Sequence, residues 1–206
     1  GRGGKGISVR SANDSASLIS PVFRGVLRSE LKVRGAKTSV SREPFVTLQL
    51  EIEASRSLDG ALAAFFGAET VALGAGVVGK KTFRIESLPS VMVICLKRFA
   101  YSAENAMGQK VGHHVRFPME MEIPQHFLHA RGAAAMKYRL FSVVTHHGRD
   151  IASGHYTCDV LRNVKDDMNQ LVPQWYFCDD SKVSAVSERD VLERPAYMLM
   201  YASKSA

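Results

Sequence analysis

Residues 91–99 read VMVICLKRF, the most apolar run in the chain. Apolar side chains occupy consecutive positions of this run until Lys97. A strand with one face in water alternates apolar and polar residues, whereas a strand buried on both faces is apolar at every position. The run therefore predicts a central strand of a sheet that is covered on both faces.

Further strand signals lie on both sides of this run. Residues 45–52 (FVTLQLEI) alternate apolar and polar side chains, which is the pattern of a half-buried strand. The other candidate strands are residues 81–85, 138–145, 155–161, 175–178 and 197–201. Residues 162–174 carry mixed charges, and we expect them to loop out at the surface. The C-terminal half is thus predicted to form a mostly antiparallel sheet.

Two short helices are expected among these strands. Ser57 is a good N-cap residue, and the apolar residues that follow it recur at helical spacing until Gly67. Ser187–Leu192 has the pattern of a second, shorter capped helix. Few helices and many antiparallel strands together predict the α+β fold class.

The charge of the chain is concentrated at one end. The chain has 206 residues, a hydrophobic fraction of 46% and a net charge of +7. Residues 1–50 hold 9 Lys/Arg and 3 Asp/Glu, whereas the remainder holds 18 and 17. Residues 1–17 are rich in Gly, Ser and Arg and predict a flexible basic linker. Since the rest is nearly neutral, nucleic acid is not expected as a partner.

The cysteine content and the hydropathy of the chain limit the cellular compartments that we expect for the protein. Cys95, Cys158 and Cys178 cannot form an even disulfide framework, and no pair has the spacing of zinc ligands. The sequence also contains no apolar run of the roughly 18 residues that a membrane span needs. We therefore expect no membrane association, no cofactor and a reducing location, in the cytoplasm, the nucleus or both.

The residues suited to chemistry lie between positions 146 and 180. His146-His147-Gly148 is followed by Gly154-His155-Tyr156 at the start of one predicted strand, and Asp179-Asp180 ends another. A carboxylate beside a histidine can fix its tautomer and stabilise the imidazolium, which suits general acid–base catalysis. A histidine at a strand end with solvated turn carboxylates remains an alternative interpretation.

The order and wording of the motifs resemble those of the ubiquitin-specific proteases, the peptidase C19 family of ubiquitin carboxyl-terminal hydrolases. The resemblance extends from Pro21 to Tyr201. Its blocks are Phe45–Ile52 with Ser57-Leu58, Leu88–Phe99 (LPSVMVICLKRF), Phe117-Pro118, Tyr138–Gly148, Gly154-His155-Tyr156, Trp175–Val183 and Ala196–Tyr201 (AYMLMY).

This resemblance implies a fold, a substrate and a site. The fold would be a papain-like cysteine-protease palm with a β finger extension, and residues 18–206 would be the fingers and palm of a partial catalytic domain. His155 would be the general base, Asp179 its orienting acid, and Asp180 a neighbour that shares or replaces that role. The partners would be ubiquitin and ubiquitinated proteins. The residues flanking the ubiquitin tail would be His146, His147, Gly148, Gly154 and Tyr156.

Two departures from the family pattern shape the functional prediction. The family's Gly/Asn-rich box with the nucleophilic cysteine has no counterpart here, so this chain alone is predicted to be inactive. The positions that resemble the family's zinc-binding pairs, Val33 with Ala36 and Val71 with Gly74, offer no thiolate, so no metal is expected. The alternatives are an inactive ubiquitin-binding or scaffold module, and a papain-like peptidase acting on ordinary peptides.

Overall fold

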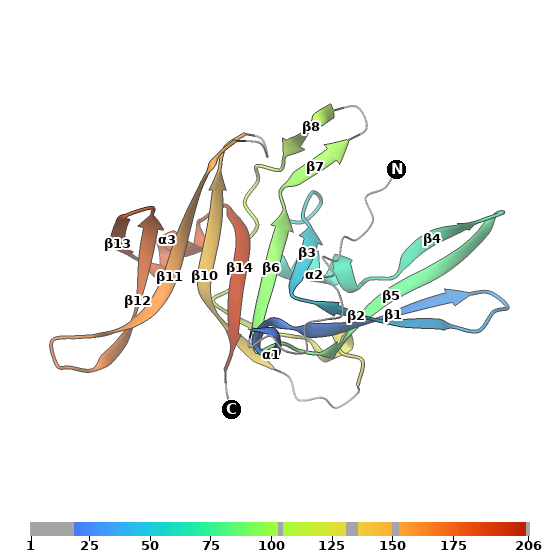
Figure 1. Cartoon of the computed structure of the whole chain (residues 1–206), viewed down its shortest axis with the longest axis horizontal. Helices are drawn as coiled ribbons and strands as arrows, with labels where there is room; N and C mark the ends of the chain where they lie inside the picture. The colour runs from blue at the N-terminus through green and yellow to red at the C-terminus, as the bar shows by residue number, and fades with distance from the viewer. Residues whose placement is uncertain (1–18, 103–104, 131–135, 150–152, 205–206) are drawn as a thin grey trace.

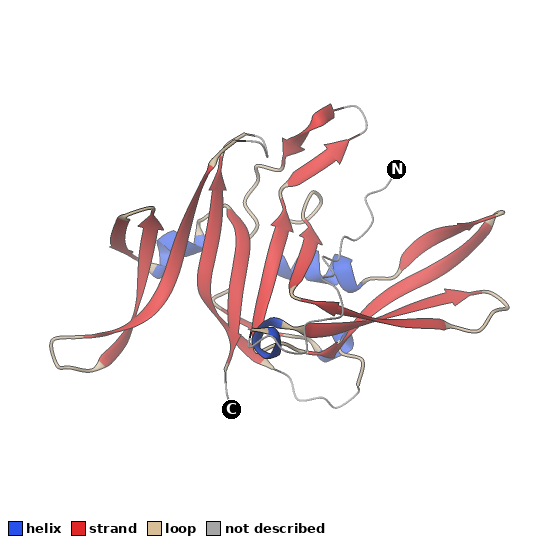
Figure 2. Cartoon of the chain, viewed as in Figure 1, coloured by secondary structure: helices blue, strands red, loops and turns tan. Residues whose placement is uncertain are grey.

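The computed structural model describes residues 19–102, 105–130, 136–149 and 153–204 (Figure 1). Strands dominate these residues, and the few helices are short (Figure 2). The predicted basic linker, residues 1–17, lies outside the described residues. None of the helices within the described ranges is long and apolar enough to cross a membrane.

The larger sheet, here called the palm sheet, has eight strands and contains the predicted site residues. Its order is β13-β12-β11-β10-β14-β6-β3, with β9 paired to β10. Every pair is antiparallel except β3 with β6. The sheet thus confirms the prediction of a mostly antiparallel α+β fold. Its strands are β3 Thr47–Glu51, β6 Val91–Lys97, β9 Glu120–Glu122, β10 Lys137–His147, β11 His155–Lys165, β12 Leu171–Asp179, β13 Lys182–Val186 and β14 Ala196–Ser203.

Strand β6 holds the apolar run and lies between β14 and β3. Met92, Ile94 and Leu96 are fully buried, and Val93 on the other face is 6% exposed. Both faces of the strand are therefore covered, as predicted. The residue that follows this strand is Arg98. It is 1% exposed, and its guanidinium donates hydrogen bonds to three backbone carbonyls, those of Val111, His113 and Ala196.

The second sheet, here called the finger sheet, has the order β2-β1-β5-β4 and extends to the right of the palm sheet in Figure 1. Its strands are β1 Gly25–Val33, β2 Ser39–Phe45, β4 Glu69–Gly74 and β5 Val77–Ser87. The sequence did not indicate β2 and β4. Both are exposed over most of their length, so they carry little apolar alternation. Buried finger residues such as Leu27, Phe83 and Ile85 belong to the same core cluster as residues of the palm sheet.

Short helices flank the sheets. Helix α1 is Ser20–Phe23, α2 is Leu58–Phe66, and α3 is Glu188–Leu192, with a 3-10 turn (η2) at Gln125–Phe127. The predicted caps are confirmed: Ser57 Oγ accepts from the Gly60 N–H, and Ser187 forms a capping box with Asp190. On α2, Phe65 stacks on Phe83 of β5, with ring centroids 5.5 Å apart, and so α2 joins the two sheets.

The β11–β12 hairpin is longer than the sequence suggested. The predicted surface loop over residues 162–174 is wrong, because pairing continues from Arg162–Gln174 to Lys165–Leu171. Asp166 closes the turn by accepting hydrogen bonds from the N–H groups of Met168 and Gln170. Much of this hairpin is exposed on both faces, so its strands lack the apolar alternation that would have indicated them.

A two-stranded ribbon follows β6. It consists of β7 Phe99–Ser102 and β8 Asn105–Lys110. In Figure 1 the ribbon lies at the upper end of the palm sheet, where β10 ends and β11 begins. The last residue of β8, Lys110, contacts that end of β10 through its side chain.

Candidate active site

The predicted site residues meet at one end of the palm sheet. Strand β10 ends at His147, which pairs with His155 at the start of β11. Strand β12 ends at Asp179, and the register that pairs Cys158 with Cys178 sets Asp179 opposite Thr157. Because side chains alternate between the faces of a sheet, His155, Thr157 and Asp179 project from the same face.

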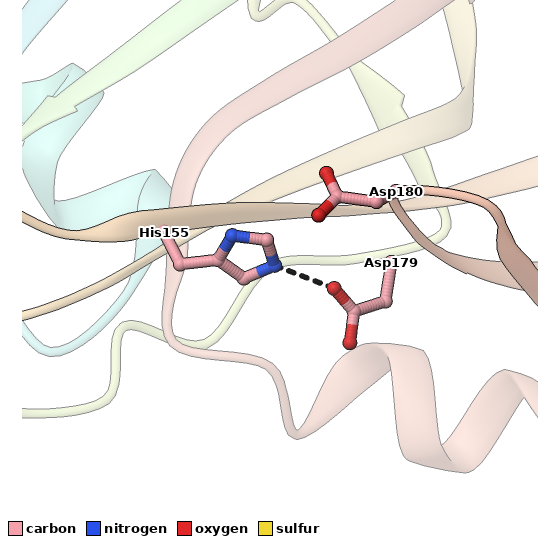
Figure 3. A group of neighbouring side chains, drawn as sticks. All are labelled: His155, Asp179 and Asp180. Atoms are coloured by element: carbon pink, nitrogen blue, oxygen red, sulfur yellow. Dashed lines mark hydrogen bonds and ion pairs between the residues drawn. The ribbon is translucent and has the colours of Figure 1, made fainter.

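His155 and Asp179 form a hydrogen-bonded ion pair across neighbouring strands (Figure 3). The distance from His155 Nε2 to Asp179 Oδ1 is 2.5 Å. The side chains are 46% and 38% exposed. The ring is thus held by one nitrogen, and Nδ1 is the nitrogen left for a reacting group.

Asp180 lies beside this pair. It is the first residue of the two-residue turn between β12 and β13, and its φ of 50° lies in the left-handed region, which Asp tolerates. Figure 3 shows its carboxylate near the His155 ring, with no bond drawn to it. Asp180 therefore acts on the histidine through its charge.

These carboxylates alter the acidity of the histidine. The hydrogen bond that Asp179 accepts from the imidazole raises the pKa of His155, desolvation opposes this, and the charges of Asp179 and Asp180 add to the increase. A carboxylate stabilises the imidazolium because it favours the charged form of the ring. The arrangement suits an imidazole that takes up and gives back a proton.

Among the described residues, the same three form the one group of His, Cys, Asp or Glu side chains whose ligand atoms lie close enough together to hold a metal ion. One ligand atom from each of His155, Asp179 and Asp180 lies within 4.8 Å of the other two. The imidazole–carboxylate bond, however, already occupies one ligand atom of both His155 and Asp179. This geometry fits proton transfer better than metal coordination, which needs those lone pairs directed at an ion.

The other predicted site residues are divided between two faces. His147 is on the face of His155: its Nε2 lies 2.8 Å from Thr157 Oγ1, and the two histidine rings are 6.2 Å apart. His146 and Tyr156 pair with each other on the opposite face, with ring centroids 4.8 Å apart. His146 is buried, whereas Tyr156 is 53% exposed. The structure therefore does not bring all the predicted tail-flanking residues to one surface.

Two glycines lie where the chain leaves β10 and where it enters β11. Gly148 has a φ of 145°, which side-chain-bearing residues rarely adopt. At Gly154, a Cβ would lie 2.2 Å from His146 Nε2 and 2.4 Å from the His147 carbonyl oxygen. Glycine is required there because the chain entering β11 lies directly against the His146 ring.

None of the three cysteines is arranged to react with His155. Cys158 and Cys178 lie opposite each other on β11 and β12, on the face away from His155 and Asp179. Burial raises the pKa of Cys158, and burial likewise raises that of Cys95 on β6. A reactive cysteine needs the opposite shift, toward the thiolate.

Two ionic groups near the site were not indicated by the sequence motifs. Asp159 is fully buried, and the Arg194 guanidinium donates to both carboxylate oxygens, at 3.0 and 3.2 Å. Desolvation raises the pKa of Asp159, and the Arg194 bonds oppose this. The sequence feature that could have indicated this ion pair is a charged residue, Asp159, in the middle of the predicted strand 155–161. The second group is Lys110, which contacts the end of β10 and belongs to none of the sequence motifs described above.

The sequence profile of the family described as "Ubiquitin carboxyl-terminal hydrolase" matches residues 6–201. "Ubiquitin hydrolase B" of Dictyostelium discoideum is 37% identical over an alignment of 191 residues that covers 89% of this chain and 40% of that protein. "Probable ubiquitin carboxyl-terminal hydrolase 3" of Schizosaccharomyces pombe is 34% identical over 229 residues, covering 100% of this chain and 43% of that protein.

Solved structures show the same fold. A chain of the SAGA Ubp8/Sgf11/Sus1/Sgf73 DUB module bound to ubiquitin aldehyde superposes with a TM-score of 0.79 at 25% identity. That match covers 94% of this chain and 44% of the solved chain. Another structure of the module gives a TM-score of 0.77 at 26% identity, covering 96% and 44%. This chain thus spans less than half the length of the proteins that it matches.

Proposed function

Because the chain belongs to the ubiquitin carboxyl-terminal hydrolase family, we propose that it supplies the histidine and the acidic residue of a thiol-dependent deubiquitinase. The reaction is hydrolysis of the isopeptide or peptide bond at the C-terminal glycine of ubiquitin. The observation that carries this proposal is the bond between His155 Nε2 and Asp179 Oδ1. It leaves Nδ1 of His155 to serve a nucleophile.

The nucleophile comes, in this proposal, from a segment outside residues 1–206. Its thiolate attacks the glycine carbonyl carbon to form a C–S bond, and the His155 imidazolium gives its proton to the leaving nitrogen as the C–N bond breaks. Neutral His155 then takes a proton from water, whose oxygen attacks the thioester. The thiolate leaves, and ubiquitin is released with a free carboxylate.

The acidic residues make His155 suitable for both proton transfers. Asp179 holds the ring through Nε2–H and stabilises the imidazolium that forms in each cycle. Asp180 adds negative charge beside the ring and raises its pKa further. Asp179 is therefore assigned the orienting role, and Asp180 the supporting one.

The same proposal covers the partners and the location. Ubiquitin and ubiquitinated proteins are the substrates, and the ubiquitin tail passes the end of the palm sheet at His155. Of the predicted tail-flanking residues, His147 lies on the face of His155, Gly148 and Gly154 lie between β10 and β11, and His146 and Tyr156 lie on the other face. The solved module that shares this fold was captured with ubiquitin aldehyde, which supports ubiquitin as the ligand. The three cysteines, all free thiols, agree with a cytoplasmic or nuclear location.

The test is turnover of a fluorogenic ubiquitin C-terminal amide by the full-length protein. His155→Ala should lower kcat by at least about 1,000-fold, because the variant lacks the imidazole that transfers the proton. His129→Ala, which removes an exposed imidazole from the loop after η2, serves as the matched control and should leave turnover unchanged. Equal turnover by wild type and His155→Ala would remove His155 from the mechanism. Ubiquitin binding without turnover would instead identify a scaffold.

A further inference from the structure

The ammonium group of Lys110 contacts acceptors on residues 146–148, where β10 ends and the turn toward His155 begins. Its Nζ donates to the carbonyl oxygen of His146 at 2.8 Å and to that of Gly148 at 2.7 Å. It also lies 3.3 Å from Nδ1 of the His146 ring. An ammonium has three N–H donors, so these three contacts can use all of them. The Lys110 side chain thereby holds both His146, near the end of β10, and Gly148, the first residue after that strand.

The contact with the ring defines the state of His146. A lysine ammonium can only donate, so Nδ1 of His146 must be the acceptor and the ring carries its proton on Nε2. The ring is also 4% exposed and packs edge-on against Phe99, with centroids 5.3 Å apart. Lys110 and Phe99, which pair across the two strands of the β7–β8 ribbon, therefore both contact the ring.

The His146 ring in turn touches the chain that enters β11. A Cβ at Gly154 would lie 2.2 Å from Nε2 and 2.8 Å from Cε1 of His146, so the ring lies in direct contact with the Gly154 backbone. His155 is the next residue. A continuous set of contacts thus leads from Lys110 through His146 and Gly154 to the histidine that bonds Asp179.

Lys110 is not an ordinary solvated lysine. Burial lowers its pKa, and the charge of Arg98 lowers it further. Partial desolvation of a cation is unfavourable unless hydrogen bonds replace the lost water. The carbonyls of His146 and Gly148 provide that replacement, so the lysine and the turn stabilise each other.

We propose that Lys110 is a positioning residue, which ties the β7–β8 ribbon to His146 and Gly148 at the end of β10 and, through the His146 ring and Gly154, sets the position of the His155 imidazole relative to Asp179. This proposal rests on the proposed deubiquitinase function for its catalytic consequence. The structural part, that Lys110 holds the turn, can be measured without any substrate.

The structural part is tested by hydrogen exchange in the full-length protein. Lys110→Met keeps the apolar stem and removes the donors. It should speed exchange of the amides of residues 146–149 and 153–155 by about tenfold or more, since local opening becomes easier. Lys204→Met, which removes the partner of Glu120 at the far end of β10, is the control and should leave these amides unchanged. Unchanged exchange in Lys110→Met would overturn the proposal.

The catalytic part is tested by kinetics on the same variants. Lys110→Met should lower kcat by about 10- to 100-fold with little change in KM, because a misplaced base slows the reaction without removing substrate contacts. Lys110→Arg keeps a charged donor and should recover part of the loss, with slower exchange than Lys110→Met. Faster exchange with unchanged kcat would show a structural tie without a positioning role. An inactive wild-type protein would refute the proposed function, while the exchange result still decides whether Lys110 holds the turn.

Discussion

The two sheets of this molecule differ in how they are held together. The palm sheet presents the His155–Asp179 pair at an end that is fixed by side-chain bonds from neighbouring segments. The finger sheet is packed near the palm and becomes exposed outward, as in β4, where no residue is buried. The palm sheet thus positions a few polar side chains, whereas the finger sheet forms an extension with little buried surface at its outer end. A change at the palm end should alter chemistry more than stability, whereas a change at the finger base should do the reverse.

The largest expected effect tests the palm end. In the full-length protein, Asp179→Asn should lower kcat by about 1,000- to 10,000-fold, because the ring loses its orienting carboxylate. The melting temperature should change little, since both partners are about half exposed and exposed pairs contribute little to stability. Asp167→Asn in the turn of the β11–β12 hairpin removes the same charge far from the pair. A similar loss in that control would show that net charge, and not the pair, controls the rate.

The same variant has a defined pH dependence. Asp179 raises the pKa of His155 above its ordinary value of 6.5. The pair therefore stabilises the folded state below about pH 6.5, and this contribution is lost as the pH rises through the higher pKa of the folded state. A titration of the His155 ring by NMR should show a lower pKa in Asp179→Asn than in wild type. Any small difference in melting temperature should appear at pH 6 and vanish at pH 9.

The second prediction concerns the finger base. Phe83 is 1% exposed and stacks on Phe65 of α2. Phe83→Ala should lower the free energy of unfolding by about 3–5 kcal/mol, because it leaves a cavity where the two sheets meet. Leu73→Ala, near the outer end of β4 at a residue that is 46% exposed, should cost less than about 0.5 kcal/mol. Urea denaturation measures both, and equal costs would contradict the gradient in packing along the fingers.

The same contrast explains what the sequence could predict about the fold. Strand β6 was predictable because burial on both faces leaves a continuous apolar run. Helix α2 was predictable because its cap and its apolar spacing agree. Strands β2 and β4 were not, since exposed strands carry no alternation to detect. Hydrophobic patterns report burial, so they fail where a sheet leaves the core.

The site was predictable to a similar, limited extent. The motifs around His155 and Asp179 named two residues that the structure brings into contact, 24 positions apart. Their strand register, the buried position of Arg98 and the contacts of Lys110 depend on tertiary packing, and no local pattern encodes that. Because side chains alternate along a strand, the sequence positions alone separate His146 and Tyr156 from His147 and His155.

The smallest expected effect concerns metal at the outer fingers. The side chains at Val33, Ala36, Val71 and Gly74 cannot ligate zinc, so excess EDTA should change the free energy of unfolding by less than about 0.5 kcal/mol. A structural zinc site would behave differently, because its binding energy is part of the folding energy. Thermal melts with EDTA and with added zinc measure this directly. A large loss of stability in EDTA would point to the other candidate metal ligands, which are His155, Asp179 and Asp180. Repeating the melts with His155→Ala would show whether that group binds the ion. Loss of the EDTA effect in that variant would place the ion on the proposed catalytic pair and would exclude the assignment of that pair to proton transfer alone.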